Sequence, residues 1–389
     1  MLVIVAGALA NKPFNGGEAW VRMSWLRGFE QLGCQVYFLE QIAPQTCVDE
    51  QGAPSSFEDS VNLAYFQEVV AALGFEGRAA LACEDESSVA GARFPDLDQV
   101  TRSADLMVNI SGHLRMPRLF NGPRVKAYVD IDPGFTQYWH AEGINGASLA
   151  GHDLYYTIGE NIGGPECPIP SGGFDWRPVR QPVLLEDWPF VDPHAGFNRF
   201  TTIASWRGSF GQVEAGGRRF GLKVHEFRKV IDLPRLAGLD FEIALDIHPA
   251  DVRDRDSLLA HGWRLVDPKA ASGDPFDFRR YVQQSGAEFS VAQGIYVETN
   301  SGWFSDRTVR YLASGKPALV QDTGFSRHLP VGRGLMTFRT PQEAADGARH
   351  IAREYEAHAE AARAIATDFF KSDIVLGKVL DDVKAVARI

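Results

Sequence analysis

The stretch Gly302-Trp303-Phe304-Ser305-Asp306-Arg307, which continues to Ser314-Gly315-Lys316-Pro317, decides the fold. An apolar run from Glu288 to Val297 precedes it and predicts a strand. A short helix is expected over Thr308 to Ala313, because Ser305 or Asp306 can cap its start and Gly315 can end it. The following Pro317 then opens a second strand, 318–320.

This arrangement of strand, loop and helix start predicts an anion site. The loop residues Ser301 and Gly302 are small, and Ser305 and Arg307 add a hydroxyl and a guanidinium. The free amides and the positive dipole end of a helix point to the same place, so an anion is stabilised there. The geometry suits a diphosphate.

Composition limits the class of protein. With 389 residues the chain is too long for one ordinary core, so two domains are expected. The net charge of -11 argues against nucleic acid and anionic membrane as partners. No run of 18 apolar residues occurs, and the strand-like start 1–5 follows no basic segment. We therefore expect a cytoplasmic protein without a membrane span.

Strands and helices alternate along the whole chain, which predicts an α/β fold. A proline-rich stretch, 165–193, interrupts the alternation and resembles a stiff connection between domains. The sequence predicts two Rossmann-like domains that face a central cleft. Their expected bounds are 1–190 for the N-terminal domain and 198–370 for the C-terminal domain, with a helix in 371–389 that could cross back to the first domain.

The order of elements and residues 305–317 together resemble the GT-B glycosyltransferases. The segment 157–164, with Asp175-Trp176 and Gln181-Pro182-Val183 after it, resembles a bacterial subgroup of them. The resemblance implies an acceptor-binding role for 1–190 and a nucleotide-sugar-binding role for 198–370. Gly16 and Gly17 are similar to the paired glycines that face the donor in that family. Arg207 and Lys223 stand like the arginine and lysine that grip the donor phosphates. The resemblance implies a glycosyltransferase that uses a nucleotide-diphosphate sugar as co-substrate and needs neither a further cofactor nor a metal.

One position departs from the family pattern. Many retaining members carry a glutamate seven positions before the proline, where it binds the donor ribose, and here that position is Arg310. Asp306 lies one turn earlier on the same helical face and could replace it. Glu298, eight residues before Asp306, stands where a family carboxylate often contacts the sugar.

Glycosyl transfer also needs a group that takes up the acceptor proton. Asp130 and His113 each follow an expected N-terminal strand, 125–129 and 106–110, and Asp130 is our first choice as general base. Asp132 follows the same strand and is an alternative base, although Asp132-Pro133-Gly134 is typical of a turn. Asp130-Ile131-Asp132 also matches the metal-binding Asp-x-Asp of GT-A enzymes, but the expected second nucleotide domain disfavours that alternative.

Two other functions fit the same architecture. A nucleotide-sugar epimerase would need acid and base groups around the donor sugar and no acceptor pocket, and a non-catalytic nucleotide-sugar binder would need neither. For a transferase, the expected acceptor is a small molecule, a glycan or a peptide.

Further candidate donor contacts are Arg218 and Arg219, in the glycine-rich loop 208–221.

Overall fold

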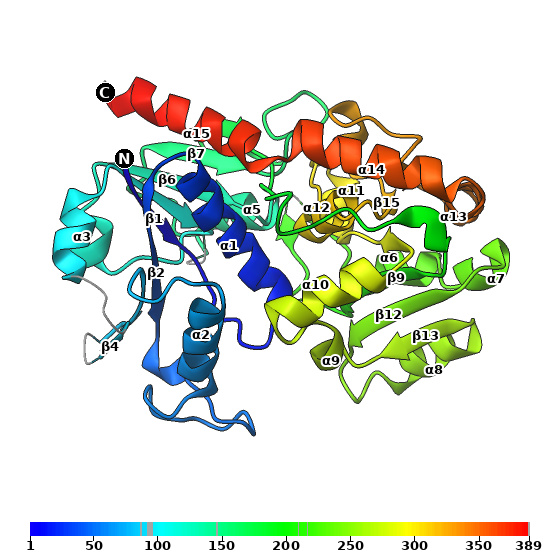
Figure 1. Ribbon diagram of the computed structural model, residues 1–389, viewed down its shortest axis with the longest axis horizontal. Coiled ribbons are helices and arrows are strands. Elements are labelled where there is room, and N and C mark those ends of the chain that lie inside the picture. Colours follow the sequence, from blue (N-terminus) through cyan, green and yellow to red (C-terminus); the bar gives the residue numbers. More distant parts are fainter. Residues whose placement is uncertain (86–87, 92–95, 145–146, 209, 216, 388–389) are drawn as a thin grey trace.

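The computed structural model describes residues 1–85, 88–91, 96–144, 147–208, 210–215 and 217–387. Two separate sheets organise these residues (Figure 1). The first has the order β4-β3-β2-β1-β5-β6-β7-β8, and only β4 runs antiparallel to its neighbour. Its strands are β1 (Leu2–Ala6), β2 (Gln35–Ile42), β3 (Ala79–Cys83), β4 (Val89–Ala90), β5 (Leu106–Ile110), β6 (Val125–Asp130), β7 (Leu154–Thr157) and β8 (Trp176–Pro178).

The second sheet is entirely parallel and has the order β13-β12-β9-β14-β15-β16. Its first strand in the chain, β9, lies between β12 and β14, so the chain leaves β9 toward both sides of the sheet. A small antiparallel hairpin, β10 with β11, lies outside it. The strands are β9 (Phe200–Ser205), β10 (Glu214–Ala215), β11 (Arg218–Arg219), β12 (Phe241–Asp246), β13 (Trp263–Val266), β14 (Ala287–Ser290), β15 (Ala318–Gln321) and β16 (Leu335–Phe338).

Helices cover both sheets, as the hydrophobic character of parallel strands requires. We call the part built on the first sheet the N-lobe and the part built on the second the C-lobe. The helices of the N-lobe are α1 (Gly16–Gln31), α2 (Val61–Ala72), α3 (Leu97–Ser103), α4 (Pro117–Phe120) and α5 (Phe135–Ala141). Those that follow in the chain are α6 (Lys223–Lys229), α7 (Leu233–Ala237), α8 (Val252–Ala260), α9 (Pro268–Ser272), α10 (Pro275–Gln284), α11 (Gly294–Glu298), α12 (Asp306–Ala313), α13 (Pro341–Arg353), α14 (Tyr355–Phe369) and α15 (Ser372–Ala387).

Helix α15 crosses back over the N-lobe (Figure 1). It packs against α1, and Leu376 and Ser372 lie so close to Gly28 that a Cβ there would meet them at 2.5 and 3.0 Å. At the far end, the Arg124 side chain donates to the carbonyl of Ala387 at 2.8 Å. No helix in the described ranges is both long enough and apolar enough to cross a membrane.

Several predicted element bounds are wrong. The strand predicted over Glu288 to Val297 ends at Ser290, and Gly294–Glu298 forms helix α11 instead. A continuous apolar run is compatible with a buried strand and with a buried helix, so periodicity could not separate them. The helix expected over Thr308 to Ala313 begins two residues earlier, at Asp306.

The first turns of helix α1 contact the C-lobe, beside α10 (Figure 1). At its start, a Cβ on Gly16 would lie 2.0 Å from the carbonyl oxygen of Asp274, so no other residue fits without displacing backbone. The indole of Trp20 donates to the carbonyl of Pro275 at 2.6 Å. The glycine pair therefore lets two backbones from different lobes approach each other.

We expect Gly16→Ala to lower the free energy of unfolding by about 1–3 kcal/mol, the usual cost of overpacking a rigid contact. Gly377→Ala is the matched control, because Gly377 lies within α15 and a Cβ there would meet nothing within 4 Å. The control should be neutral or slightly stabilising. Denaturant melts of both variants measure the difference, and equal stability of Gly16→Ala and the wild type would contradict the proposed contact.

Candidate functional site

A cavity of about 580 Å³ lies between the two lobes. The N-lobe contributes the loop before α1, the first turn of α1 and the segment after β6. The C-lobe contributes the carboxyl ends of β9 and β12 and the starts of α6, α9 and α12. The charged side chains on the lining are Glu18, Asp132, Lys223, Asp246, Lys269, Asp306 and Arg307.

Arg307 stands at the carboxyl ends of β9 and β14. Its Nε donates to Oε1 of Glu288 at 2.7 Å, its Nη1 to the carbonyl of Ile203 at 2.7 Å, and its Nη2 to Oγ of Ser290 at 2.8 Å. The guanidinium is therefore held rigidly by both strands while its side chain borders the cavity. This is the place in a parallel sheet where ligands bind, because the chain departs to both sides there.

Lys223 is the first residue of α6 and also lines the cavity. Its main-chain amide donates to Oε1 of Gln293 at 2.7 Å, which fixes the helix start. Burial, together with repulsion from Arg307, lowers the pKa of its ammonium to about 8. Within the described residues no carboxylate oxygen lies within 4 Å of that ammonium. Lys223 and Arg307 thus concentrate positive charge on one wall of the cavity.

Asp306 and Arg310 occupy opposite environments although one helical turn separates them. The carboxylate of Asp306 borders the cavity, and burial raises its pKa. It has no ion-pair partner within 4 Å in the described part of the chain. Arg310 is fully buried and turned away, with Nη2 donating to the carbonyl of Trp20 at 3.2 Å and to Oγ of Ser24 at 3.0 Å. The carboxylate available to a ligand on this helix is Asp306.

The N-lobe presents Asp132, not Asp130, to the cavity. Asp130 is fully buried and accepts hydrogen bonds from Thr136 Oγ1, Gln137 Nε2, Thr157 Oγ1 and the amide of Asp132, at 2.7, 2.8, 2.7 and 3.1 Å. These partners satisfy a carboxylate that ties β6 to α5 and β7, and they leave it no access to a substrate.

Asp132 accepts a hydrogen bond from the hydroxyl of Tyr296, on α11 of the C-lobe, at 3.1 Å. Burial, with the nearby charges of Asp130 and Glu18, raises the pKa of Asp132 to about 7. A carboxylate with such a pKa can accept or donate a proton near neutral pH. The sequence pattern offered Asp132 as an alternative general base, behind Asp130 as the first choice.

Behind Glu18 lies a second set of ionisable groups. Arg22 forms an ion pair with Glu18 and is itself buried. Burial would raise the pKa of Glu18, but the positive charges of Arg22 and Lys12 outweigh it and hold that pKa below its usual value. Burial and the charge of Arg22 lower the pKa of His113 to about 3, so this imidazole is neutral. His113 is not among the residues that line the cavity.

Most of the loop before α12 does not line the cavity, and backbone hydrogen bonds fix it to neighbouring segments. The amide of Gly302 donates to the carbonyl of Thr323 at 2.8 Å, and the carbonyl of Ser301 accepts from the amide of Asn161 at 3.1 Å. Ser301 and Ser305 are both buried, and neither is on the cavity lining, nor is Gly302. Trp303 is the residue of this loop that reaches the cavity, where its ring stacks on Tyr296 at 4.6 Å.

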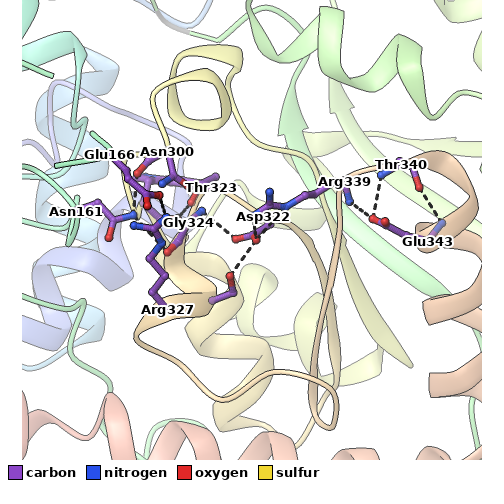
Figure 2. Close-up of polar contacts among 12 residues, drawn as sticks. Asn161, Glu166, Asn300, Asp322, Thr323, Gly324, Arg327, Arg339, Thr340 and Glu343 are labelled. Carbon is purple, nitrogen blue, oxygen red and sulfur yellow. Dashed lines mark hydrogen bonds and ion pairs between the residues drawn. The ribbon is translucent and has the colours of Figure 1, made fainter. Parts of the chain in front are cut away.

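Asn161 of the N-lobe joins this loop to the segment after β15 (Figure 2). Its Nδ2 donates to the carbonyls of Asn300 and Gly324 at 2.7 and 3.3 Å. Nearby, Arg327 forms an ion pair with Glu166 (Figure 2). Arg339 forms a second ion pair, with Asp322 (Figure 2). These contacts fix the loop relative to both lobes.

Arg207 does not border the cavity. Its Nε donates to Oδ2 of Asp251 at 2.9 Å, and its Nη2 pairs with the other oxygen of the same carboxylate. Arg218 lies 3.8 Å from Glu298 and Arg219 pairs with Glu214. None of these arginines lines the cavity, and neither does Glu298, whose Oε1 accepts from the amide of Gly221 at 3.1 Å. Two residues of the loop 208–221, at positions 209 and 216, lie outside the described residues.

Of the paired glycines, Gly17 borders the cavity and Gly16 does not. Of all residues chosen from the sequence as site residues, the structure thus brings together Gly17, Lys223, Asp306 and Arg307. Asp132, an alternative base in the sequence analysis, also lines the cavity. Glu18 and Tyr296 line it too, and the sequence pattern did not single them out. No group of three or more His, Cys, Asp or Glu side chains among the described residues is placed to hold a metal ion.

Solved structures with the same arrangement of two facing lobes are glycosyltransferases. AviGT4, a glycosyltransferase involved in avilamycin A biosynthesis, is 12% identical with a TM-score of 0.54, and the match covers 100% of this chain and 98% of that one. The chain has the GT-B fold. The predicted fold class is therefore confirmed, from the order of both sheets and from matches that span the whole chain.

Two further GT-B structures carry nucleotides. Anabaena HepE, solved with UDP-glucose, has a TM-score of 0.58 at 10% identity, and the match covers 99% of this chain and 100% of that one. The pneumococcal O-GlcNAc transferase GtfA, solved with UDP and GlcNAc, has a TM-score of 0.57 at 10% identity, with 99% of each chain covered. No protein-family model matches the sequence, and a comparison with curated proteins gave no match.

The raised pKa of Asp132 predicts a pH-dependent cost to stability. The folded protein favours the protonated carboxyl, so stability is greatest below the unfolded pKa of about 4 and falls as pH rises to about 7. Asp132→Asn removes this cost. We expect the variant to have a higher free energy of unfolding than the wild type at pH 8, with a difference that shrinks toward pH 4.

Chemical denaturation at pH 4, 6 and 8 measures the effect. Asp175→Asn is the control, because the side chain of Asp175 is 90% exposed and its removal should give no such trend. An Asp132→Asn protein that is less stable than the wild type at pH 8 would contradict the assignment.

Proposed function

We propose that this GT-B protein is a glycosyltransferase that moves a sugar from a nucleotide-diphosphate donor to an acceptor hydroxyl. One observation carries the proposal: the ammonium of Lys223, which forms no ion pair among the described residues, lies beside Arg307 in the cavity, at the carboxyl ends of β9 and β14. A diphosphate leaving group gathers negative charge as its bond to the sugar breaks, and fixed cations stabilise that charge. The likeness to transferases solved with UDP supports this choice of donor.

The proposed donor lies along the C-lobe wall. Its diphosphate contacts Lys223 and Arg307, and its nucleoside extends past the end of β12 toward α9. Asp306 then accepts hydrogen bonds from the ribose hydroxyls, the role that the family assigns to a carboxylate one turn later. In this proposal the positive side chains replace a metal.

Asp132 is the proposed proton acceptor. It lies on the N-lobe wall, where the acceptor would bind, and Tyr296 fixes the orientation of its carboxylate. In an inverting transfer, Asp132 takes the acceptor proton, the acceptor oxygen bonds to the anomeric carbon, and the bond from that carbon to the diphosphate oxygen breaks. The acceptor is a small molecule, a glycan or a peptide, and the proposed compartment is the cytoplasm.

An epimerase acting on the same donor is the second candidate. Glu18 and Asp132 both face the cavity, and an epimerase needs an acid and a base near the donor sugar. Analysis of the products formed from donor alone separates the two functions, because an epimerase yields an isomeric nucleotide sugar and a transferase yields free nucleotide diphosphate. Binding of the nucleotide without any product would instead indicate a non-catalytic binder.

Nucleotide binding tests the donor site. We expect UDP, GDP or dTDP to raise the melting temperature of the wild type by a few degrees in EDTA, because ligands that bind only the folded state stabilise it. Lys223→Met should lower the affinity for the nucleotide that binds at least about 10-fold, since a charged contact to phosphate is lost. Lys229→Met is the control, because Lys229 lies on the same helix, is exposed and does not line the cavity.

If none of the three nucleotides shifts the melting temperature of the wild type, the donor proposal is wrong. Equal affinities for Lys223→Met and Lys229→Met would reject the role of Lys223. A requirement for added Mg²⁺ or Mn²⁺ would reject metal independence.

The pH dependence of turnover tests Asp132. With the nucleotide sugar that binds and water as a substitute acceptor, the rate of donor cleavage should rise with pH through about 7, as Asp132 loses its proton. Asp132→Asn should lower the rate by about 10²–10⁴-fold without changing nucleotide affinity. Tyr296→Phe removes a hydrogen bond that favours the charged carboxylate, so the rise should move to higher pH. If the pH profile of Tyr296→Phe is the same as that of the wild type, Tyr296 does not influence the pKa of Asp132.

A further inference from the structure

Phe14 combines two features that are unusual in one residue. Its backbone has a φ of 60°, a left-handed conformation that is unfavourable for a bulky side chain. The residue is also 42% exposed although its side chain is a large hydrophobic group. Strained residues persist where the surrounding structure holds them, and they gather at ligand sites. Phe14 lies in the loop between β1 and α1 and borders the cavity between the lobes.

The chain is fixed on both sides of Phe14. Before it, the amide of Asn11 donates to Oε1 of Glu40 at 2.9 Å, and its Nδ2 donates to the same oxygen at 2.8 Å. After it, the side chain of Asn15 caps α1 by accepting from the amide of Glu18 at 3.2 Å. The ring of Tyr65 lies 5.8 Å from that of Phe14. The ring is therefore presented by a rigid loop.

A cation of the C-lobe contacts the ring of Phe14. The ammonium of Lys269, on α9, lies 4.2 Å from the centre of the ring. This cation–π contact shows that a face of the ring is accessible from the C-lobe side of the cavity. Lys269 borders the same cavity, together with Asp246 at the end of β12.

The sheet order gives the direction of a nucleotide in this cavity. If its diphosphate lies at Lys223 and Arg307, beside β9 and β14, its nucleoside extends across the end of β12, which lies on the other side of β9. The next segment on that side is α9, which follows β13 and carries Lys269. The base therefore arrives where Phe14 and Lys269 meet. An exposed aromatic face suits a planar base, and stacking tolerates any of the bases.

We propose that Phe14 is the base-stacking residue of this protein, contributed by the N-lobe, and that the nucleobase takes the place of the Lys269 ammonium on its ring. The proposal rests on the proposed function, because it requires a nucleotide in the cavity. It adds a contact from the opposite lobe: a nucleotide joins the two lobes through its base, whereas a bare diphosphate touches only the cations of the C-lobe.

Binding of nucleotide and of inorganic pyrophosphate to Phe14 variants tests the proposal. Calorimetry should show that Phe14→Ala binds the nucleoside diphosphate about 5- to 100-fold more weakly than the wild type, while its affinity for pyrophosphate is unchanged. Phe14→Gly should lose the same affinity although glycine relieves the backbone strain, and Phe14→Tyr should retain it. Phe276→Ala is the matched control, because Phe276 is 39% exposed, lies under the guanidinium of Arg279 and does not line the cavity.

Three results would overturn the proposal while leaving the proposed function intact: unchanged nucleotide affinity in Phe14→Ala, an equal loss of nucleotide and pyrophosphate affinity, or an equal effect of Phe276→Ala. A wild-type protein that binds pyrophosphate and no nucleotide would also reject it. If the wild type binds neither ligand, the donor site itself is wrong and the inference fails with it.

Discussion

The contact of α1 with the C-lobe is the constraint on which the cavity depends. It begins where Gly16 meets the backbone carbonyl of Asp274, and it continues through the hydrogen bond from Trp20 to Pro275. Because α1 is fixed there, its first turn places Gly17 and Glu18 opposite the start of α12. Two walls with different chemistry then face each other. The charged groups of the N-lobe wall are carboxylates, whereas those of the C-lobe wall are the three cations Lys223, Lys269 and Arg307 together with the carboxylates of Asp246 and Asp306.

Arg310 belongs to the same contact and explains a departure from the family pattern. A guanidinium buried without a carboxylate is costly unless hydrogen bonds satisfy it. Here the carbonyls of Asp306 and Trp20 and the hydroxyl of Ser24 provide them, although Nε has no partner among the described residues. The side chain that stands at the family's carboxylate position therefore joins the lobes. One turn nearer the helix start, the carboxylate of Asp306 borders the cavity.

The sequence predicted the features that local patterns determine. Alternation of apolar strands with helices was enough for the two Rossmann-like lobes, and the motif around Arg307 was enough to locate the start of α12. The sequence could not predict which charged residues reach the cavity, because that depends on partners far away in the chain. Asp251 holds Arg207 from 44 positions away, and Thr157 helps to satisfy Asp130 from 27 positions away. Tyr296 was hidden because its apolar run looked like a continuation of a strand. The domain bounds and the site roles stay predictions.

The distribution of charge in the cavity favours one orientation of a bound ligand. Arg307 already has a buried counter-ion in Glu288, so it contributes position and hydrogen-bond donors more than net charge. Lys223 forms no ion pair in the described part of the chain, and burial lowers the pKa of its ammonium although Asp306 and Glu288 attract the charge. An anion beside Lys223 would reverse that penalty, since an opposite charge favours the protonated amine. The opposite wall cannot supply it, because the raised pKa of Asp132 shows that a further negative charge is disfavoured there. A ligand with its anionic part on the C-lobe and an uncharged hydroxyl near Asp132 satisfies both walls at once, and a sugar attached to a diphosphate has that order of groups.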